Sequence, residues 1–160
     1  IQFGFSGAID ENSIFPELPP RNMRKAQLDL ARVDSVNSFG VRLWMRWIWA
    51  IEKQHPETLI DLENCPHVFV KQILVVANFT PACVRVKSMS LPYYCESCDE
   101  VTEFTIRDSD PALKAGSSAE AAFSLNKKPC AKCKKMSDVD VDLPHYLKAF
   151  EKFSENKLQA

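Results

Sequence analysis

The segment KAQLDLARVDSVNSFGVRLWMRWIWAIEKQHPETLIDL, residues 25–62, decides the fold. It begins with an apolar alternation over Lys25–Val33 that predicts a strand, and it ends with a second short strand over Thr58–Leu62. Between them, Phe39–Gln54 carries a dense apolar pattern that stops before Pro56 and predicts a helix. A strand, a helix and a strand in this order imply a parallel crossover.

The segments on either side of this unit continue the same pattern. Upstream, Ile1–Phe5 predicts a strand and Ser13–Leu18 predicts a short helix. Downstream, His67–Phe79 predicts a second helix and Ala82–Met89 a last strand. We therefore expect an α/β domain over residues 1–91, in which a sheet is flanked by helices.

Length and composition agree with an ordinary folded protein. The chain has 160 residues, of which 46% are hydrophobic and 26% are charged, so intrinsic disorder and a large multidomain enzyme are excluded. The net charge of −1 gives no global positive field that would attract nucleic acid. The longest apolar stretch, Leu43–Ile51, is interrupted by Arg46 and falls far short of the roughly 20 residues that cross a bilayer. We expect no membrane span and no signal peptide.

Four short motifs in residues 1–90 carry a resemblance: GAID at 7–10, QLDL at 27–30, VNSFGV at 36–41 and LENCP at 62–66. They resemble the STAS domain of bacterial anti-sigma-factor antagonists. The resemblance implies a STAS-like sheet flanked by helices and a non-enzymatic bacterial signalling protein. In that family a partner kinase of the anti-sigma type can phosphorylate a serine at the start of the second helix, and by position this serine is Ser38. The family usually has Asp before this serine and a small residue after it, where this chain has Asn37 and Phe39.

The position of Ser38 at a helix start allows two interpretations. A phosphate there would face unpaired backbone N–H groups and the positive end of the helix dipole. Alternatively, Ser38 or Asn37 is a plain N-cap that contributes about 1 kcal/mol. Because Asp10 and Asp34 are expected around the same loop, we take them, with Asn37 and Phe39, as candidates for a partner surface.

The predicted helix over Phe39–Gln54 has more apolar surface than one sheet contact needs. One interpretation is that an upstream segment or the second module packs on it. The other is a dimer or partner surface built on Trp44 and Trp47, since exposed apolar patches mark interaction sites.

Two Cys-x-x-Cys pairs, Cys95/Cys98 and Cys130/Cys133, distinguish the second part of the chain. Each pair can form a tight turn whose sulfurs point at one cation, and four thiolates favour zinc. A closed set of four cysteines leaves no open position for catalysis, so we expect a structural Zn²⁺. Disulfides and a thioredoxin-like redox pair are the competing interpretations.

We expect residues 92–160 to form a small β-rich zinc-ribbon-like module that ends in a helix opened by Pro144. Its predicted strands are Tyr93–Tyr94, Val101–Ile106 and Met136–Val141. The metal would supply much of the folding energy of so small a module.

The two remaining cysteines, Cys65 and Cys83, are expected to be inert core thiols of a reduced, cytoplasmic protein. A cluster of lysines surrounds the second cysteine pair: Lys127, Lys128, Lys132, Lys134 and Lys135. Its expected role is to offset the net negative charge of a zinc ion held by four thiolates.

Three functional interpretations remain. The first is a regulatory STAS protein that binds a protein partner, such as an anti-sigma-type serine kinase, and is switched at Ser38. The second is a scaffold that uses the same fold without phosphorylation. The third is a zinc ribbon that binds nucleic acid, which the neutral chain disfavours. We expect no enzyme, because the three histidines have no evident catalytic partner.

Overall fold

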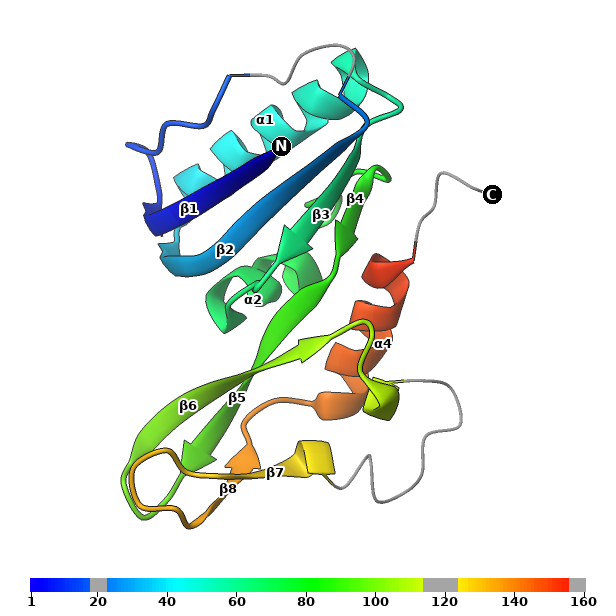
Figure 1. Cartoon of the computed structure of the whole chain (residues 1–160). Helices are drawn as coiled ribbons and strands as arrows, with labels where there is room; N and C mark the ends of the chain where they lie inside the picture. Colours follow the sequence, from blue (N-terminus) through cyan, green and yellow to red (C-terminus); the bar gives the residue numbers. More distant parts are fainter. Residues whose placement is uncertain (18–22, 114–123, 156–160) are drawn as a thin grey trace.

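The structure, a computed structural model, describes residues 1–17, 23–113 and 124–155. It contains two sheets of four strands each (Figure 1). The first has the order β1-β2-β3-β4, and its neighbouring strands are parallel. Its strands are β1 (Gln2–Ile9), β2 (Lys25–Val36), β3 (Leu59–Glu63) and β4 (Val84–Val86), and its helices are α1 (Ser38–Gln54) and α2 (His67–Val75).

The predicted alternation of strands and helices is confirmed, and with it the parallel crossovers. Some boundaries differ from the prediction. β1 continues to Ile9, and α2 ends at Val75 because Val76 has an extended backbone. The helix expected from Ser13 is absent over the described residues 13–17. This segment instead crosses from β1 towards β2 on the side of α1.

The tryptophan-rich face of α1 is covered from within the chain. Trp44 is completely buried, with its ring edge-on to Phe69 of α2 at 5.0 Å between centroids. Phe15 stacks on Trp47 at 5.2 Å, and the Trp47 indole donates to the Pro16 carbonyl at 2.9 Å. The cover is therefore the β1–β2 crossover together with α2. The expectation that Trp44 belongs to a partner surface is wrong, because its ring lies in the core.

The start of α1 packs against the end of β1 so closely that only glycine fits at position 40. A Cβ on Gly40 would lie 1.9 Å from the carbonyl oxygen of Ile9. The same carbonyl accepts a hydrogen bond from the Asn37 N–H at 3.1 Å. Asn37 and Gly40 thus fix the position of the amino end of α1 against β1.

The second sheet is antiparallel and has the order β6-β5-β8-β7. The predicted strands Tyr93–Tyr94 and Val101–Ile106 lie within β5 and β6, and the strand predicted over Met136–Val141 is confirmed as β8 but ends at Val139. The bounds are β5 (Ser88–Cys95), β6 (Glu100–Arg107), β7 (Lys127–Pro129) and β8 (Met136–Val139), and a short 3₁₀ helix follows β6 at Pro111–Leu113.

One run of chain links the two sheets. β4 is followed directly by β5, and Cys65 at the end of β3 forms a parallel bridge with Met89. The Cys65 N–H donates to the Ser88 carbonyl at 3.0 Å, and the Ser90 N–H donates to the Cys65 carbonyl at 2.8 Å. The boundary expected after Leu91 lies inside β5, where that side chain is fully buried. The division into residues 1–91 and 92–160 stays a prediction.

The terminal helix α4 (Leu143–Ser154) packs beside β4 and α2 (Figure 1). Asp142 caps it by accepting from the His145 N–H at 3.2 Å. Tyr146 and Phe150 are buried, so the apolar stripe of this helix is a packing face. Among the described residues, no helix has both the length and the apolar character needed to cross a membrane.

Candidate functional site

Two turns of similar geometry present the four paired cysteines. Cys95 ends β5, and the N–H of Asp99 bonds back to its carbonyl at 2.8 Å. Cys130 follows β7, and the N–H of Lys134 bonds back to its carbonyl at 3.1 Å. Asp99 and Lys134 both have a left-handed backbone, with φ of 53° and 63°. Each Cys-x-x-Cys pair is thus wound into a tight turn, and the pairing of β5 with β8 brings the two turns together.

The four sulfur atoms form one compact cluster. All of them lie within 4.8 Å of one another. The closest separations join Cys95 to Cys133 at 3.6 Å and Cys98 to Cys130 at 3.9 Å, and all four are free thiols. Cys95 and Cys130 are buried, whereas Cys98 and Cys133 are partly exposed. These residues could hold a metal ion, as the spacing of the pairs predicts.

The surroundings of the cluster act differently on its sulfurs. They favour the thiolate at Cys95 and Cys130, whereas a hydrogen bond with Cys133, and then burial, raises the pKa of Cys98 to about 12. Burial opposes the ionisation of Cys95, but hydrogen bonds from Cys133, Cys130 and the Cys98 backbone, together with the nearby Ser137 hydroxyl, lower the pKa of the Cys95 thiol to about 6. Thiolates are the form that binds metal ions. The Cys95 sulfur therefore favours the charged form that a cation would bind.

Cys130 is prepared in a similar way. The backbone N–H groups of Cys133 and Lys132 donate to its sulfur and lower the pKa of Cys130. Hydrogen bonds from a tight turn to sulfur thus stabilise the charged form of the first cysteine in each pair, Cys95 and Cys130.

Ser137 is a residue of this site that sequence reasoning missed. It lies on β8 with only 2% of its surface exposed, and its hydroxyl has no hydrogen-bond partner in the described part of the chain. The hydroxyl lowers the pKa of the Cys95 thiol, which places it close to that sulfur. The only sequence signal was its place in a strand that follows the second cysteine pair.

The lysines around the second turn are partly neutralised by carboxylates. Lys132 contacts Glu100 at 2.5 Å, and Lys127 contacts Asp138 at 2.6 Å. The Glu100 carboxylate raises the pKa of Lys132 by hydrogen bonding and by its charge. The Lys134 ammonium donates to the Ala131 carbonyl at 2.8 Å. Part of the cluster thus serves local contacts in the two turns.

The candidate residues around Ser38 gather at the carboxyl end of β1 and β2. Asn37 is the N-cap of α1, and its side-chain oxygen accepts from the N–H groups of Phe39 at 3.0 Å and Gly40 at 2.9 Å. Ser38 is the first residue of the helix and is exposed. Of the two residues considered for the cap, Asn37 takes the role and leaves the Ser38 hydroxyl outside it.

Two further side chains complete this face. The Asn37 amide donates to Glu11 at 2.9 Å, which ties the β1–β2 crossover to the helix start. Phe39 is 55% exposed, and the Arg42 guanidinium lies 4.5 Å from its ring centroid. The sequence interpretation did not single out Glu11 or Arg42, because neither belongs to a motif.

The two aspartates expected near Ser38 have local partners. Asp10 is half-buried and accepts from the Asn12 N–H at 2.9 Å. Asp34 is exposed and accepts from the Ser35 hydroxyl at 3.0 Å. Trp47 is half-buried beneath Phe15, so only a part of it is open to a partner.

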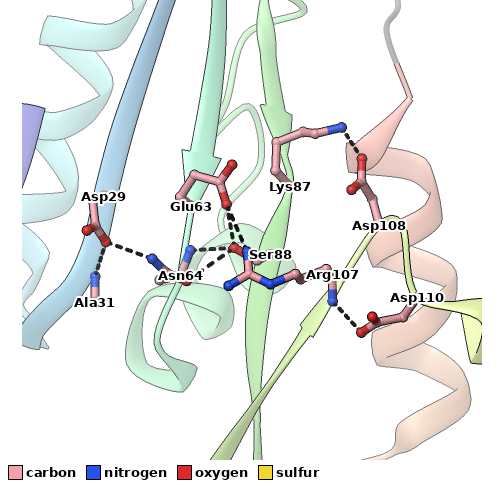
Figure 2. A network of polar contacts seen from close by, with 9 residues as sticks. All are labelled: Asp29, Ala31, Glu63, Asn64, Lys87, Ser88, Arg107, Asp108 and Asp110. Carbon is pink, nitrogen blue, oxygen red and sulfur yellow. Dashed lines mark hydrogen bonds and ion pairs between the residues drawn. The ribbon is translucent and has the colours of Figure 1, made fainter. Parts of the chain in front are cut away.

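A polar network lies where the two sheets meet (Figure 2). The Asn64 side chain donates to Asp29 at 3.1 Å, and the Asn64 N–H donates to the Ser88 hydroxyl at 2.7 Å. Ser88 in turn donates to Glu63 at 2.8 Å, and Arg107 of β6 lies 3.7 Å from the same carboxylate. The network joins β2, β3, β5 and β6, and we assign it to holding the sheets in register.

Cys65 and Cys83 are buried free thiols, as predicted. Burial raises the pKa of both, that of Cys83 to about 12, so neither is a reactive thiolate.

Comparisons of the chain with protein-family models, with curated proteins and with solved structures give no match. Any assignment of function therefore rests on the residues and their geometry.

Proposed function

We propose that the chain is a non-enzymatic bacterial signalling protein of the STAS type that binds a protein partner at the amino end of α1. The observation that carries this proposal is that Asn37, and not its neighbour Ser38, caps α1. Asn37 caps the helix, and Ser38 keeps an exposed hydroxyl at its first position. Nothing in the cap requires this hydroxyl, so it is free to accept a phosphate from an anti-sigma-type serine kinase.

The neighbours of Ser38 offer groups that can bind a partner and a contact that a phosphate on Ser38 would change. Phe39 with Arg42 forms an exposed aromatic and cationic pair, the kind of group that anchors protein interfaces. A phosphate on Ser38 would add about −1.5 to −2 charges beside Glu11. Repulsion between these groups would strain the Asn37–Glu11 contact and shift the crossover segment. Phosphorylation would thereby change the face that the partner meets.

We further propose that the cysteine cluster holds a structural zinc ion. Four sulfurs at about 2.3 Å from a tetrahedral zinc lie about 3.8 Å apart, and the observed separations of 3.6 Å and 3.9 Å agree with this value. Zinc would supply four Zn–S bonds that fix the two turns. Cys95, Cys98, Cys130 and Cys133 would occupy every tetrahedral position, which suits a structural role.

The test of the switch starts from the protein isolated from its own cells and from the protein treated with an anti-sigma-type kinase and ATP. Intact mass and fragment mapping should place one phosphate on Ser38, and Ser38→Ala should remove it. Ser35→Ala is the matched control, because Ser35 is an exposed serine nearby. Absence of phosphate, together with unchanged partner binding in Ser38→Asp, would favour the scaffold interpretation instead.

The test of the metal measures zinc per chain by elemental analysis of protein purified without chelator. We expect one zinc ion, which Cys98→Ser should release or weaken at least tenfold. Cys83→Ala is the control, because Cys83 is a buried free thiol that does not belong to the cluster of four cysteines. Equal zinc content in the two variants would contradict the assignment.

A further inference from the structure

Two sheets of four strands have four outer edges, and three of them are protected. The edge of β4 lies beside α4 (Figure 1). β6 carries the charged residues Glu100, Glu103 and Arg107. β7 has only three residues, Lys127–Pro129, and they include two lysines and a proline. A covering helix, charge, short length and proline are the devices by which proteins keep sheet edges from pairing.

The fourth edge, that of β1, has none of these devices among the residues that the structure describes. Its sequence QFGFSGAI contains no charged residue and no proline over eight residues. Burial alternates strictly along it, with Gln2, Gly4 and Ser6 exposed on one face. The bulges of its pairing with β2 consist of extra residues on β2. β1 is therefore a neutral edge strand open to pairing.

The backbone groups that point outward from this edge can be identified. The Ile1 carbonyl accepts from the Gln27 N–H of β2 at 2.9 Å, so residue 1 points inward. The direction alternates along a strand, so residues 2, 4 and 6 point their N–H and C=O groups outward. At Ala8 the outward carbonyl is already bonded to the Ser13 hydroxyl at 3.1 Å. The free stretch is therefore Gln2–Ser6.

We propose that this stretch pairs antiparallel with the same stretch of a second copy, about a two-fold axis at Gly4. In this register Gly4 faces Gly4 of the other chain, and Gln2 faces Ser6. Both are hydrogen-bonded positions, which gives about six backbone bonds across the axis. Phe3 then lies opposite Phe5 at a non-hydrogen-bonded position, where side chains approach most closely.

Self-complementarity is the reason for a second copy as the occupant. The stretch has no charge, so it meets its own copy without repulsion and offers nothing that would select a charged partner. Its axial residue has no side chain, and its aromatic residues pair with each other. A hollow of about 740 Å³ between β1 and residues 10–16, lined by Phe3, Phe5 and Phe15, gives the aromatic side chains room to adjust. Ile14, which is 94% exposed on the rim, would also be covered.

Sedimentation equilibrium of the full chain over a concentration series tests the proposal. We expect the wild type to dimerise reversibly and Gly4→Pro, which removes the axial N–H, to raise the dissociation constant at least tenfold. Gly4→Ala is the matched control, because it keeps the N–H and its Cβ would meet only the end of Arg32 at 3.8 Å. Circular dichroism of each variant reports whether the fold is kept.

A second variant keeps the test decisive if proline disturbs the strand. Gly4→Lys would place two ammonium groups opposite each other at the axis, so its dimer should be weakened and partly restored by salt. A wild type that stays monomeric, or Gly4→Pro and Gly4→Lys variants that dimerise as tightly as the wild type, would overturn the proposal. The first result would leave the edge to a strand from another source. The pairing stretch lies at the amino end of β1, whereas Ser38 lies beyond its carboxyl end. Neither result therefore tests the phosphorylation of Ser38.

Discussion

Gly40 and Ile9 are in direct backbone contact, since a Cβ at position 40 would lie 1.9 Å from the carbonyl oxygen of Ile9. Ala at this position must push the helix away from β1. We expect Gly40→Ala to lower the free energy of unfolding by at least about 2 kcal/mol despite the better helix propensity of Ala. Urea denaturation measures this. Gly4→Ala, whose Cβ would make only an ordinary contact with the end of Arg32 at 3.8 Å, should change stability far less, and similar losses for both would contradict the contact.

The cap of α1 gives a second prediction. Asn37→Ala removes the acceptor for two N–H groups and should lower the free energy of unfolding by about 1 kcal/mol. Ser38→Ala should have almost no effect, because its hydroxyl lies outside the cap. Denaturant titrations of the two variants check the difference. A larger loss for Ser38→Ala would show that the serine has a structural task and would weaken the proposed switch.

The Ser137 hydroxyl gives a third prediction. Ser137→Ala should weaken metal binding at the cysteine cluster by roughly tenfold, because it removes a buried hydroxyl that lowers the pKa of Cys95 and has no other partner among the described residues. Competition with a chromophoric zinc chelator measures the affinity. Ser90→Ala, another buried serine on the neighbouring strand β5, is the control and should bind the metal as the wild type does. Equal affinity in Ser137→Ala would show that this hydroxyl does not act on the sulfur.

His67 predicts a pH dependence of stability. Burial and then the charge of Lys71 lower the pKa of His67 below its ordinary value of 6.5, against smaller opposite effects of Glu103 and Asp140. The folded state therefore favours the neutral ring. The contribution of His67 to the free energy of unfolding is fully present above pH 6.5, and it is lost as the pH falls from 6.5 through the lowered pKa of the folded state. Denaturation at pH 7.5 and 5.5 should show a smaller loss in His67→Gln than in the wild type.

The contact of His67 with Tyr146 supplies the control for that experiment. The tyrosine hydroxyl and the His67 Nδ1 lie 3.1 Å apart, and the two rings stack with centroids at 5.9 Å. Tyr146→Phe keeps the stacking and the burial of the histidine. It should therefore retain the pH dependence, whereas identical profiles for His67→Gln and the wild type would contradict it.

The order of elements and the cysteine cluster could be predicted from the sequence because both depend on local patterns. Apolar periodicity marked α1 and the strands around it, and two Cys-x-x-Cys spacings marked the cluster. The cap could be narrowed only to Asn37 or Ser38, because either side chain can reach the same N–H groups. The structure distinguishes them by the direction of the Asn37 side chain.

Other features depended on tertiary packing that no local pattern encodes. Ser13–Leu18 has helical spacing of apolar residues, yet Phe15 and Pro16 lie against Trp47 from a non-helical segment. The burial of Trp44 follows from this same crossover. Glu11 and Ser137 act through partners 26 and 42 positions away in sequence (37 − 11 and 137 − 95), so their roles appear only after folding.

The continuous path from β4 into β5 has a thermodynamic consequence. A ligand that binds only the folded state stabilises every part that unfolds with its site, by an amount that grows with the logarithm of its free concentration. Because Cys65 of the first sheet is bonded to Ser88 and Ser90 of this path, an ion at the cysteine cluster would also stabilise the tryptophan core. Where the two sheets unfold together, removal of the ion should therefore lower the free energy of unfolding of the α1 region as well as that of the cysteine turns.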